Sequence, residues 1–126
     1  MLVIDTSALM AVLQDEPDSD RCISAMATGD SLLISAGTLA EISVVAAARG
    51  VLGELTSLLG DLALEVVPVT AADARLVGEA YGRWGEGTHP AGLNFGDCFA
   101  YALAKARGCS LLFVGDDFSK TDVAVA

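Results

Sequence analysis

Residues 2–8 read LVIDTSA, a short apolar run that passes directly into an aspartate and two hydroxyl residues. Hydrophobic periodicity alone cannot distinguish a strand from a helix in so short a run. Its β-branched residues and the following Thr6 and Ser7 favour a buried strand. The carboxylate at the end of this strand has two explanations. Asp5 is either a turn or helix-cap residue, or part of a catalytic site at the end of the strand.

Three further short apolar runs predict strands, namely SLLISA at 31–36, LEVVPV at 64–69 and SLLFV at 110–114. Helical patterns separate them. The expected helices cover residues 7–13, 18–27, 38–50, 51–62, 70–84 and 94–108. Strands that alternate with helices predict an α/β fold with a mostly parallel sheet and helices on both faces. Because the chain shows no repeat, low-complexity segment or linker, residues 1–126 are expected to form a single domain.

The composition excludes several classes of protein. A chain of 126 residues with 53% hydrophobic residues can bury one real core and is too apolar to be disordered. Charges interrupt every long apolar run and the N-terminus lacks a basic region, so we expect no membrane span, no signal peptide and a cytoplasmic location. Cys22, Cys98 and Cys109 are odd in number and lack CxxC spacing, which predicts buried thiols.

The formal net charge of −10, with a pI near 4.2, disfavours long-range attraction to nucleic acid. A chain so acidic suits a partner that carries basic residues, or a site where metal ions offset the acids. Ordinary solubility explains the charge equally well.

Acidic residues fall where a parallel sheet places its ligand site, at the carboxyl ends of the strands. Asp5 follows the first expected strand, and Asp116 and Asp117 follow the last one. Glu41 and Asp97 each lie in the first turn of an expected helix. Converging carboxylates raise each other's pKa values, and a bound Mg²⁺ or Mn²⁺ ion reverses that cost. The five acids therefore predict a metal site at one edge of the sheet.

Each acid also has a purely structural explanation. Thr38 with Glu41, and Asn94 with Asp97, have the spacing of a capping box. The pair at 116–117 can form an Asx turn after a strand.

VIDTSA at 3–8, the isolated Glu41, LNFGDCFAYALAK at 93–105 and LLFVGDDFSKTD at 111–122 resemble the PIN-domain family. The likeness is greatest to the VapC toxins of bacterial toxin–antitoxin systems, and it covers essentially the whole chain. The first motif alone is weak, whereas the pairing of a GDC helix start with GDDFSKTD is specific. The resemblance implies a three-layer α/β/α fold with a central parallel sheet. It also implies an endoribonuclease that depends on Mg²⁺, with Mn²⁺ as a substitute.

The acids of the family carry over onto Asp5, Glu41 and Asp97. The fourth acid is Asp117 by preference, with its neighbour Asp116 as the alternative. The resemblance implies that Asp5 and Asp97 hold the main metal ion, and that Glu41 acts through a water or as a base. The fourth acid would complete the site or hold a second metal ion.

Thr6 or Ser7 resembles the hydroxyl residue of the family, which would orient Asp5 or a metal-bound water. The implied reaction is in-line attack of water on a phosphodiester, leaving a 5′-phosphate and a 3′-hydroxyl. The candidates for contact with RNA phosphates are the basic residues Arg83, His89, Lys105, Arg107 and Lys120.

The helices expected between residues 39 and 62 carry more apolar surface than one core-facing stripe needs. They are either buried on several sides or present a groove or dimer face to a partner helix. In the family this region receives the antitoxin. The resemblance therefore implies a VapB-like antitoxin with a basic C-terminal segment, a homodimer and a higher toxin–antitoxin assembly.

Three alternatives compete with a ribonuclease. A haloacid-dehalogenase-like phosphatase needs a second aspartate two residues after Asp5, where this chain has Ser7. A receiver domain needs an aspartate at the end of the third strand, and LEVVPVT has none. A PIN-fold module that binds RNA or antitoxin with little catalysis would keep the fold. Serine- and cysteine-hydrolase chemistry is disfavoured because no GxSxG motif accompanies the single histidine, His89.

Overall fold

The centre of the fold is a sheet of four parallel strands in the order β3-β2-β1-β4. The computed structural model describes all residues, 1–126. The strands are β1 (Leu2–Ile4), β2 (Leu32–Ser35), β3 (Glu65–Val67) and β4 (Ser110–Leu112). β1 is a central strand, with Val3 in register with Leu33 on one side and Leu111 on the other. β2, β3 and β4 are shorter than the apolar runs that predicted them.

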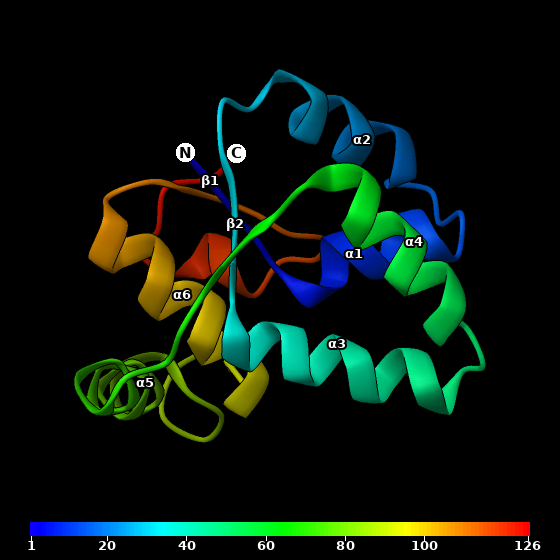
Figure 1. The fold of residues 1–126 in the computed structure, drawn as a ribbon. Helices are drawn as coiled ribbons and strands as arrows, with labels where there is room; N and C mark the ends of the chain where they lie inside the picture. The colour runs from blue at the N-terminus through cyan, green and yellow to red at the C-terminus, as the bar shows by residue number, and fades with distance from the viewer.

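Six helices cover the two faces of this sheet. They are α1 (Thr6–Leu13), α2 (Ser19–Thr28), α3 (Ala36–Ala48), α4 (Leu52–Leu62), α5 (Ala71–Trp84) and α6 (Phe95–Arg107). α5 and α6 lie on one side of the sheet, and α1 and α4 lie on the other (Figure 1). The expected three-layer α/β/α architecture with a parallel sheet is confirmed. None of these helices is both long and apolar enough to cross a lipid bilayer.

Side chains of the strands alternate between two buried clusters, because successive residues of a strand point to opposite faces. Val3 and Leu111 pack in the cluster that α5 and α6 cover. Leu2 and Ile4 pack in the cluster that α1 to α4 cover. Both faces of β1 are therefore buried, which explains why its sequence is continuously apolar rather than alternating.

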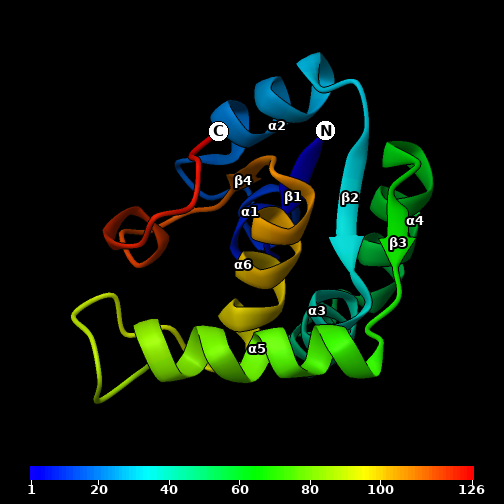
Figure 2. The same ribbon diagram turned by 90° about the vertical axis from the view of Figure 1, so that its left-hand side faces the viewer.

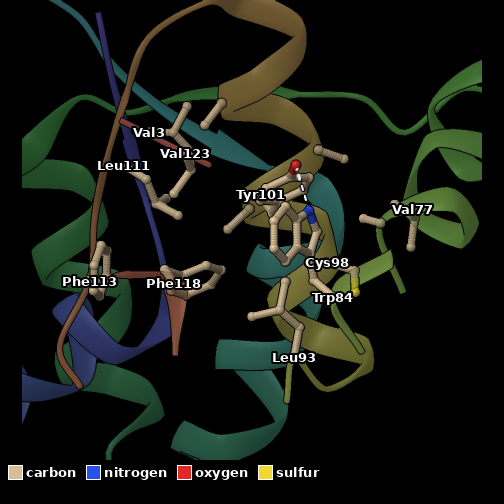
Figure 3. Packing of buried hydrophobic residues seen from close by; sticks show 14 of the residues in the cluster. Val3, Val77, Trp84, Leu93, Cys98, Tyr101, Leu111, Phe113, Phe118 and Val123 are labelled. Atoms are coloured by element: carbon tan, nitrogen blue, oxygen red, sulfur yellow. Dashed lines mark hydrogen bonds between the residues drawn. The ribbon is translucent and has the colours of Figure 1, made fainter. Parts of the chain in front are cut away.

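The cluster under α5 and α6 holds a buried polar pair (Figure 3). The indole Nε1 of Trp84 donates to the hydroxyl of Tyr101 at 2.9 Å, and that hydroxyl donates to Asp122 at 2.6 Å. Phe118 from the C-terminal segment packs against Phe113, with ring centroids 5.1 Å apart. These contacts attach the segment after β4 to the core of the fold. This segment carries Asp116 and Asp117.

The junction between β2 and α3 differs from the prediction. Ser35 ends β2 and also caps α3, because its hydroxyl accepts from the Gly37 N–H at 3.2 Å. The helix therefore begins two residues earlier than residue 38, with no loop before it. Thr38 is fully buried inside the helix, so it forms no capping box with Glu41. The prediction that Glu41 lies in the first turn is wrong, and Glu41 lies in the second.

Figure 2 shows the consequence for the site. β2 points toward α3 at the bottom of the view, and α6 runs antiparallel to it, so α6 begins at the edge where the strands end. The carboxyl end of β1, the first half of α3 and the start of α6 therefore meet at one edge of the sheet.

All three cysteines are free thiols, with Cys22 and Cys98 buried.

Candidate active site

Asp5 has two oxygens with different roles. Its Oδ2 accepts hydrogen bonds from the Ser7 N–H at 3.0 Å and from the Ser7 hydroxyl at 2.7 Å, and so caps α1. Its Oδ1 is buried and has no hydrogen-bond partner. Burial raises the pKa of Asp5 to about 6, against the opposing effect of the Ser7 hydrogen bonds. The helix-cap explanation is thus correct for one oxygen, and the other remains available to a ligand.

Ser7 connects Asp5 to the last strand. While its hydroxyl donates to Asp5, it accepts from the Val114 N–H at 2.9 Å, just beyond β4. Of the two hydroxyls expected to orient Asp5, the structure places Ser7 there. The Thr6 hydroxyl instead donates to Glu41 Oε1 at 2.6 Å. Two neighbouring residues therefore fix two carboxylates that lie far apart in sequence.

Glu41 reaches the site because α6 has a glycine where the two helices meet. The Glu41 carboxylate lies against the backbone of Gly96, and a Cβ at that position would overlap it. A second glycine, Gly37, similarly leaves room for the ring of Phe99. Gly96, directly before Asp97, is the sequence signal for this close approach of α3 and α6. Because Gly96 has no side chain, the Glu41 carboxylate can lie beside Asp97.

Asp97 also combines a structural and a chemical role. It forms the expected capping box of α6, in which its Oδ2 accepts from the Asn94 N–H at 3.0 Å and its own N–H donates to Asn94 at 2.9 Å. Its pKa is raised to about 7, first by burial and then by the charges of Asp5, Glu41 and Asp117. The charges of the other three preferred acids therefore all act on Asp97.

The two candidates for the fourth acid are both exposed. Asp117 immediately precedes the short 3₁₀ turn Phe118–Lys120, and its charge contributes to the raised pKa of Asp97. Asp116 accepts the Ser119 hydroxyl through its backbone carbonyl at 2.6 Å. Neither carboxylate accepts a hydrogen bond, so the Asx turn that was the structural alternative does not form.

A cleft of about 310 Å³ opens over Asp5, Glu41 and Asp97, and neither Asp116 nor Asp117 lines it. The expected residues in its wall are Asp5, Thr6, Ser7, Glu41 and Asp97, and the others are Met10, Glu16, Val45, Arg49 and Val114. Glu16 and Arg49 were not predicted. Arg49 follows Glu41 by eight residues, which places both on one face of α3, so helical spacing could have found it. Glu16 lies in the polar loop after α1, where no periodicity exists to indicate it.

Two of the basic residues predicted to contact RNA are engaged elsewhere. Arg83 and Lys105 both pair with Asp122, at 3.7 and 3.3 Å. The Arg83 guanidinium also lies 4.6 Å from the centre of the Trp84 ring. Lys105 is eight residues after Asp97, roughly 12 Å along the helix axis, so it lies toward the opposite end of α6.

The other three predicted contacts also lie outside the cleft wall. Arg107 lies 3.9 Å from Glu65. The His89 Nδ1 accepts from the Ala91 N–H at 3.0 Å. Lys120 is exposed at the end of the short turn that follows Asp117. Of the five predicted RNA contacts, it is the one nearest in sequence to a candidate acid.

The acids suit a divalent cation by their chemistry. Asp5 offers a buried oxygen without a partner, and Asp97 has a pKa that a nearby positive charge would lower. Carboxylate oxygens are the ligands that Mg²⁺ and Mn²⁺ prefer. As the side chains stand, no three histidine, cysteine, aspartate or glutamate residues are close enough to hold one ion together. The fit to a cation therefore lies in the type of these donors, not in a ready-formed ligand set.

Comparison with known proteins agrees with this geometry. The family model described as PIN domain matches residues 2–124. Ribonuclease VapC30 of Mycobacterium tuberculosis is 46% identical over 126 residues, covering 98% of this chain and 96% of that protein. Among solved structures, M. tuberculosis VapC20, a sarcin-ricin loop cleaving toxin, superposes with a TM-score of 0.81 at 17% identity, covering 100% of this chain and 98% of that one. VapBC2 from Rickettsia felis, bound to a promoter DNA fragment, gives 0.72 at 18% identity, covering 98% and 95%.

Proposed function

Because the chain belongs to the PIN-domain family and, within it, to the VapC ribonucleases, we propose that it is an endoribonuclease and the toxin of a type II toxin–antitoxin system. The observation that carries the proposal is the unpartnered, buried Oδ1 of Asp5 in a cleft shared with Glu41 and Asp97. A structural cap would need only one of the two oxygens. Family membership excludes the phosphatase and receiver-domain alternatives. We place the protein in the cytoplasm and treat residues 1–126 as one PIN domain.

Asp5, Asp97 and Asp117 are the residues that would hold Mg²⁺, with Mn²⁺ as a substitute. A cation bound by these acids supplies positive charge to a phosphoryl oxygen and lowers the pKa of water. Asp5 is presented at the end of a central strand and oriented by Ser7. Asp97 is held by the α6 capping box. Asp116 is the alternative to Asp117, since both follow β4.

Glu41 is the candidate base. Thr6 holds one of its oxygens, and Gly96 lets the carboxylate lie next to Asp97. In the proposed reaction Glu41 takes a proton from the attacking water, directly or through a second water. A bond forms between the water oxygen and phosphorus, the bond from phosphorus to the 3′-oxygen breaks, and that oxygen takes up a proton. The products are a 5′-phosphate and a 3′-hydroxyl.

The proposed protein partner is a VapB-like antitoxin with a basic C-terminal segment, in a homodimeric toxin that forms a higher assembly. Support comes from an apolar groove of about 390 Å³ beside α2 and α4, where Ile23 is 48% exposed and Leu58 lines the wall. The net charge of −10 suits a basic segment. Ile23→Asp should prevent complex formation with the protein encoded by the adjacent reading frame and leave RNA cleavage intact. Normal complex formation by Ile23→Asp would remove this groove from consideration.

Cleavage of structured RNA by the purified, partner-free protein tests the activity. Wild type should cut in Mg²⁺ and be silent in EDTA, and Asp5→Ala and Asp97→Ala should be inactive in both. Asp73→Ala is the matched control, because Asp73 is an acid at the same capping position of another helix. Cleavage by Asp5→Ala or Asp97→Ala at the wild-type rate would show that the site is wrong. A wild type that binds RNA without cutting it would instead favour the binding module with little catalysis.

A further inference from the structure

The seven lysines and arginines of the chain differ in how they are neutralised. Four of them pair with carboxylates, namely Arg21, Arg83, Lys105 and Arg107. The remaining three are Arg49, Arg75 and Lys120. Of these three, Arg49 alone lines the acidic cleft. The cleft therefore contains one cation, and that cation has no carboxylate partner.

Arg49 is held in place by a neutral group. It caps the C-terminus of α3, two turns after Glu41, and its Nη1 donates to the side-chain oxygen of Gln14. Gln14 itself ends α1, and the next residue, Asp15, has a left-handed backbone with φ of 49°. The chain then returns so that the Glu16 N–H donates to the Ala11 carbonyl at 2.9 Å. The turn after α1 thus sets the backbone position of Gln14, whose side chain reaches Arg49.

The choice of partner has a chemical consequence. Glu16 and Glu41 line the same cleft, yet neither forms an ion pair with Arg49. An amide oxygen orients a guanidinium without cancelling its charge. Gln14 occupies one of five N–H donors, so the rest of the planar fork is free for a second acceptor. Phosphate matches that fork in geometry and charge, which makes a phosphate group the ligand of the right class.

We propose that Arg49 contacts a phosphate of the bound RNA, next to the phosphodiester that the acids cleave, and that Gln14 positions its guanidinium. The inference rests on the proposed ribonuclease function. The negative charges of the acids in the cleft repel the phosphates of RNA. Arg49 lines the same cleft without a carboxylate partner, so its positive charge offsets part of this repulsion. A simpler role would be structural, since a cation at a helix C-terminus interacts favourably with the helix dipole.

Steady-state cleavage of a single-stranded RNA in Mg²⁺, measured over a range of salt concentrations, separates the two roles. Arg49→Gln should lower kcat/KM about tenfold or more, mainly through KM, and flatten the dependence of log kcat/KM on log salt by about 0.7, the slope of one phosphate contact to a single strand. Arg49→Lys should recover part of the loss, because it restores the charge without the fork. Gln14→Leu should raise KM by a smaller factor and leave the salt slope unchanged.

Arg75→Gln is the matched control. It removes the same charge from an exposed position of α5 outside the cleft, and should change neither KM nor the salt slope. Equal behaviour of Arg49→Gln and Arg75→Gln would overturn the inference while the ribonuclease function stands. Loss of thermal stability by Arg49→Gln with an unchanged salt slope would also overturn it, in favour of the structural role. A wild type that cleaves no RNA would refute the proposed function, and the inference with it.

Discussion

Two helices of this protein begin with the same local motif and use it differently. In α5 the Thr70 hydroxyl accepts from the Asp73 N–H at 3.2 Å, and Asp73 accepts from the Thr70 N–H at 2.9 Å. In α6 Asn94 and Asp97 exchange the equivalent bonds at 2.9 and 3.0 Å. Both are complete capping boxes with an aspartate at the third helical position.

The two aspartates nevertheless have opposite electrostatics. The Thr70 hydrogen bonds lower the pKa of Asp73, as expected for a carboxylate that accepts hydrogen bonds at a helix N-terminus. Burial and three neighbouring acids raise the pKa of Asp97 to about 7. The difference teaches that a capping box specifies where a carboxylate sits on its helix. Whether that carboxylate becomes part of an active site depends on what the rest of the chain brings to it.

The largest expected effect comes from neutralising the two aspartates in turn. Asn keeps an oxygen acceptor for the cap, so Asp97→Asn and Asp73→Asn should both fold. Asp97→Asn should lower kcat for RNA cleavage by about 10²–10³-fold, the range seen when one electrostatic group of an active site is lost. Asp73→Asn should cleave at the wild-type rate. Comparable losses in the two variants would mean that the cap, and not the charge, supports activity.

A smaller effect is expected from replacing one glycine by alanine in α6 and, for comparison, one glycine by alanine in α5. In Gly96→Ala the new Cβ meets the Glu41 carboxylate, which must move away from Asp97. Cleavage should fall by about tenfold or more, because misplacing one group by an ångström costs up to about 10²-fold. In Gly78→Ala of α5 the Cβ meets nothing, so activity should stay constant and stability should rise by about 0.5–1 kcal/mol. Full activity in Gly96→Ala would refute the proposed position of Glu41.

Metal binding should distinguish the same two positions by thermal unfolding. A ligand that binds only the folded state stabilises it, by about 1.4 kcal/mol at ten times its Kd. Millimolar Mg²⁺ should therefore raise the Tm of wild type and of Asp73→Asn, and leave Asp97→Asn nearly unchanged. The same Mg²⁺ shift in all three proteins would place the bound ion away from Asp97.

The smallest expected effect is on the pH dependence of stability in EDTA. The folded pKa of Asp97, about 7, exceeds the ordinary aspartate value of 3.8, so the folded state binds more protons between these values and loses stability as pH rises. Asp97→Asn should gain several degrees of Tm relative to wild type from pH 4 to pH 8. Asp73 has a lowered pKa, so the stability it contributes is lost only as pH falls below 4. Asp73→Asn should show a constant offset across pH 4–8, and parallel curves for both variants would contradict the contrast.

Much of the architecture could be predicted from the sequence. Short apolar runs alternating with helical patterns predicted four strands and six helices, and the helix bounds agree to within about two residues. The main error was at the start of α3, where Ser35 serves both β2 and the helix cap. A capping-box pattern at Thr38 and Glu41 indicated the wrong start, because Ser35 already caps the helix and Thr38 is buried within it.

The cleft was only partly predictable. The sequence supplied Asp5, Glu41 and Asp97 as acids at the ends of elements, and the structure brings these three into one wall. The predicted basic contacts were chosen by charge alone, and Arg83 and Lys105 pair with Asp122 instead. Charge carries no information about direction, so a surface cation cannot be assigned to a site without the fold.

The sequence by itself determined the parallel α/β plan and the identity of the acids, because hydrophobic period and helix-start chemistry are local properties. Only the tertiary structure decided which hydroxyl serves which acid, with Ser7 on Asp5 and Thr6 on Glu41. It also decided that the pKa of Asp97 is raised while the pKa of Asp73 is lowered. These outcomes depend on burial and on charges from distant segments, and neither exists until the strands and helices pack together.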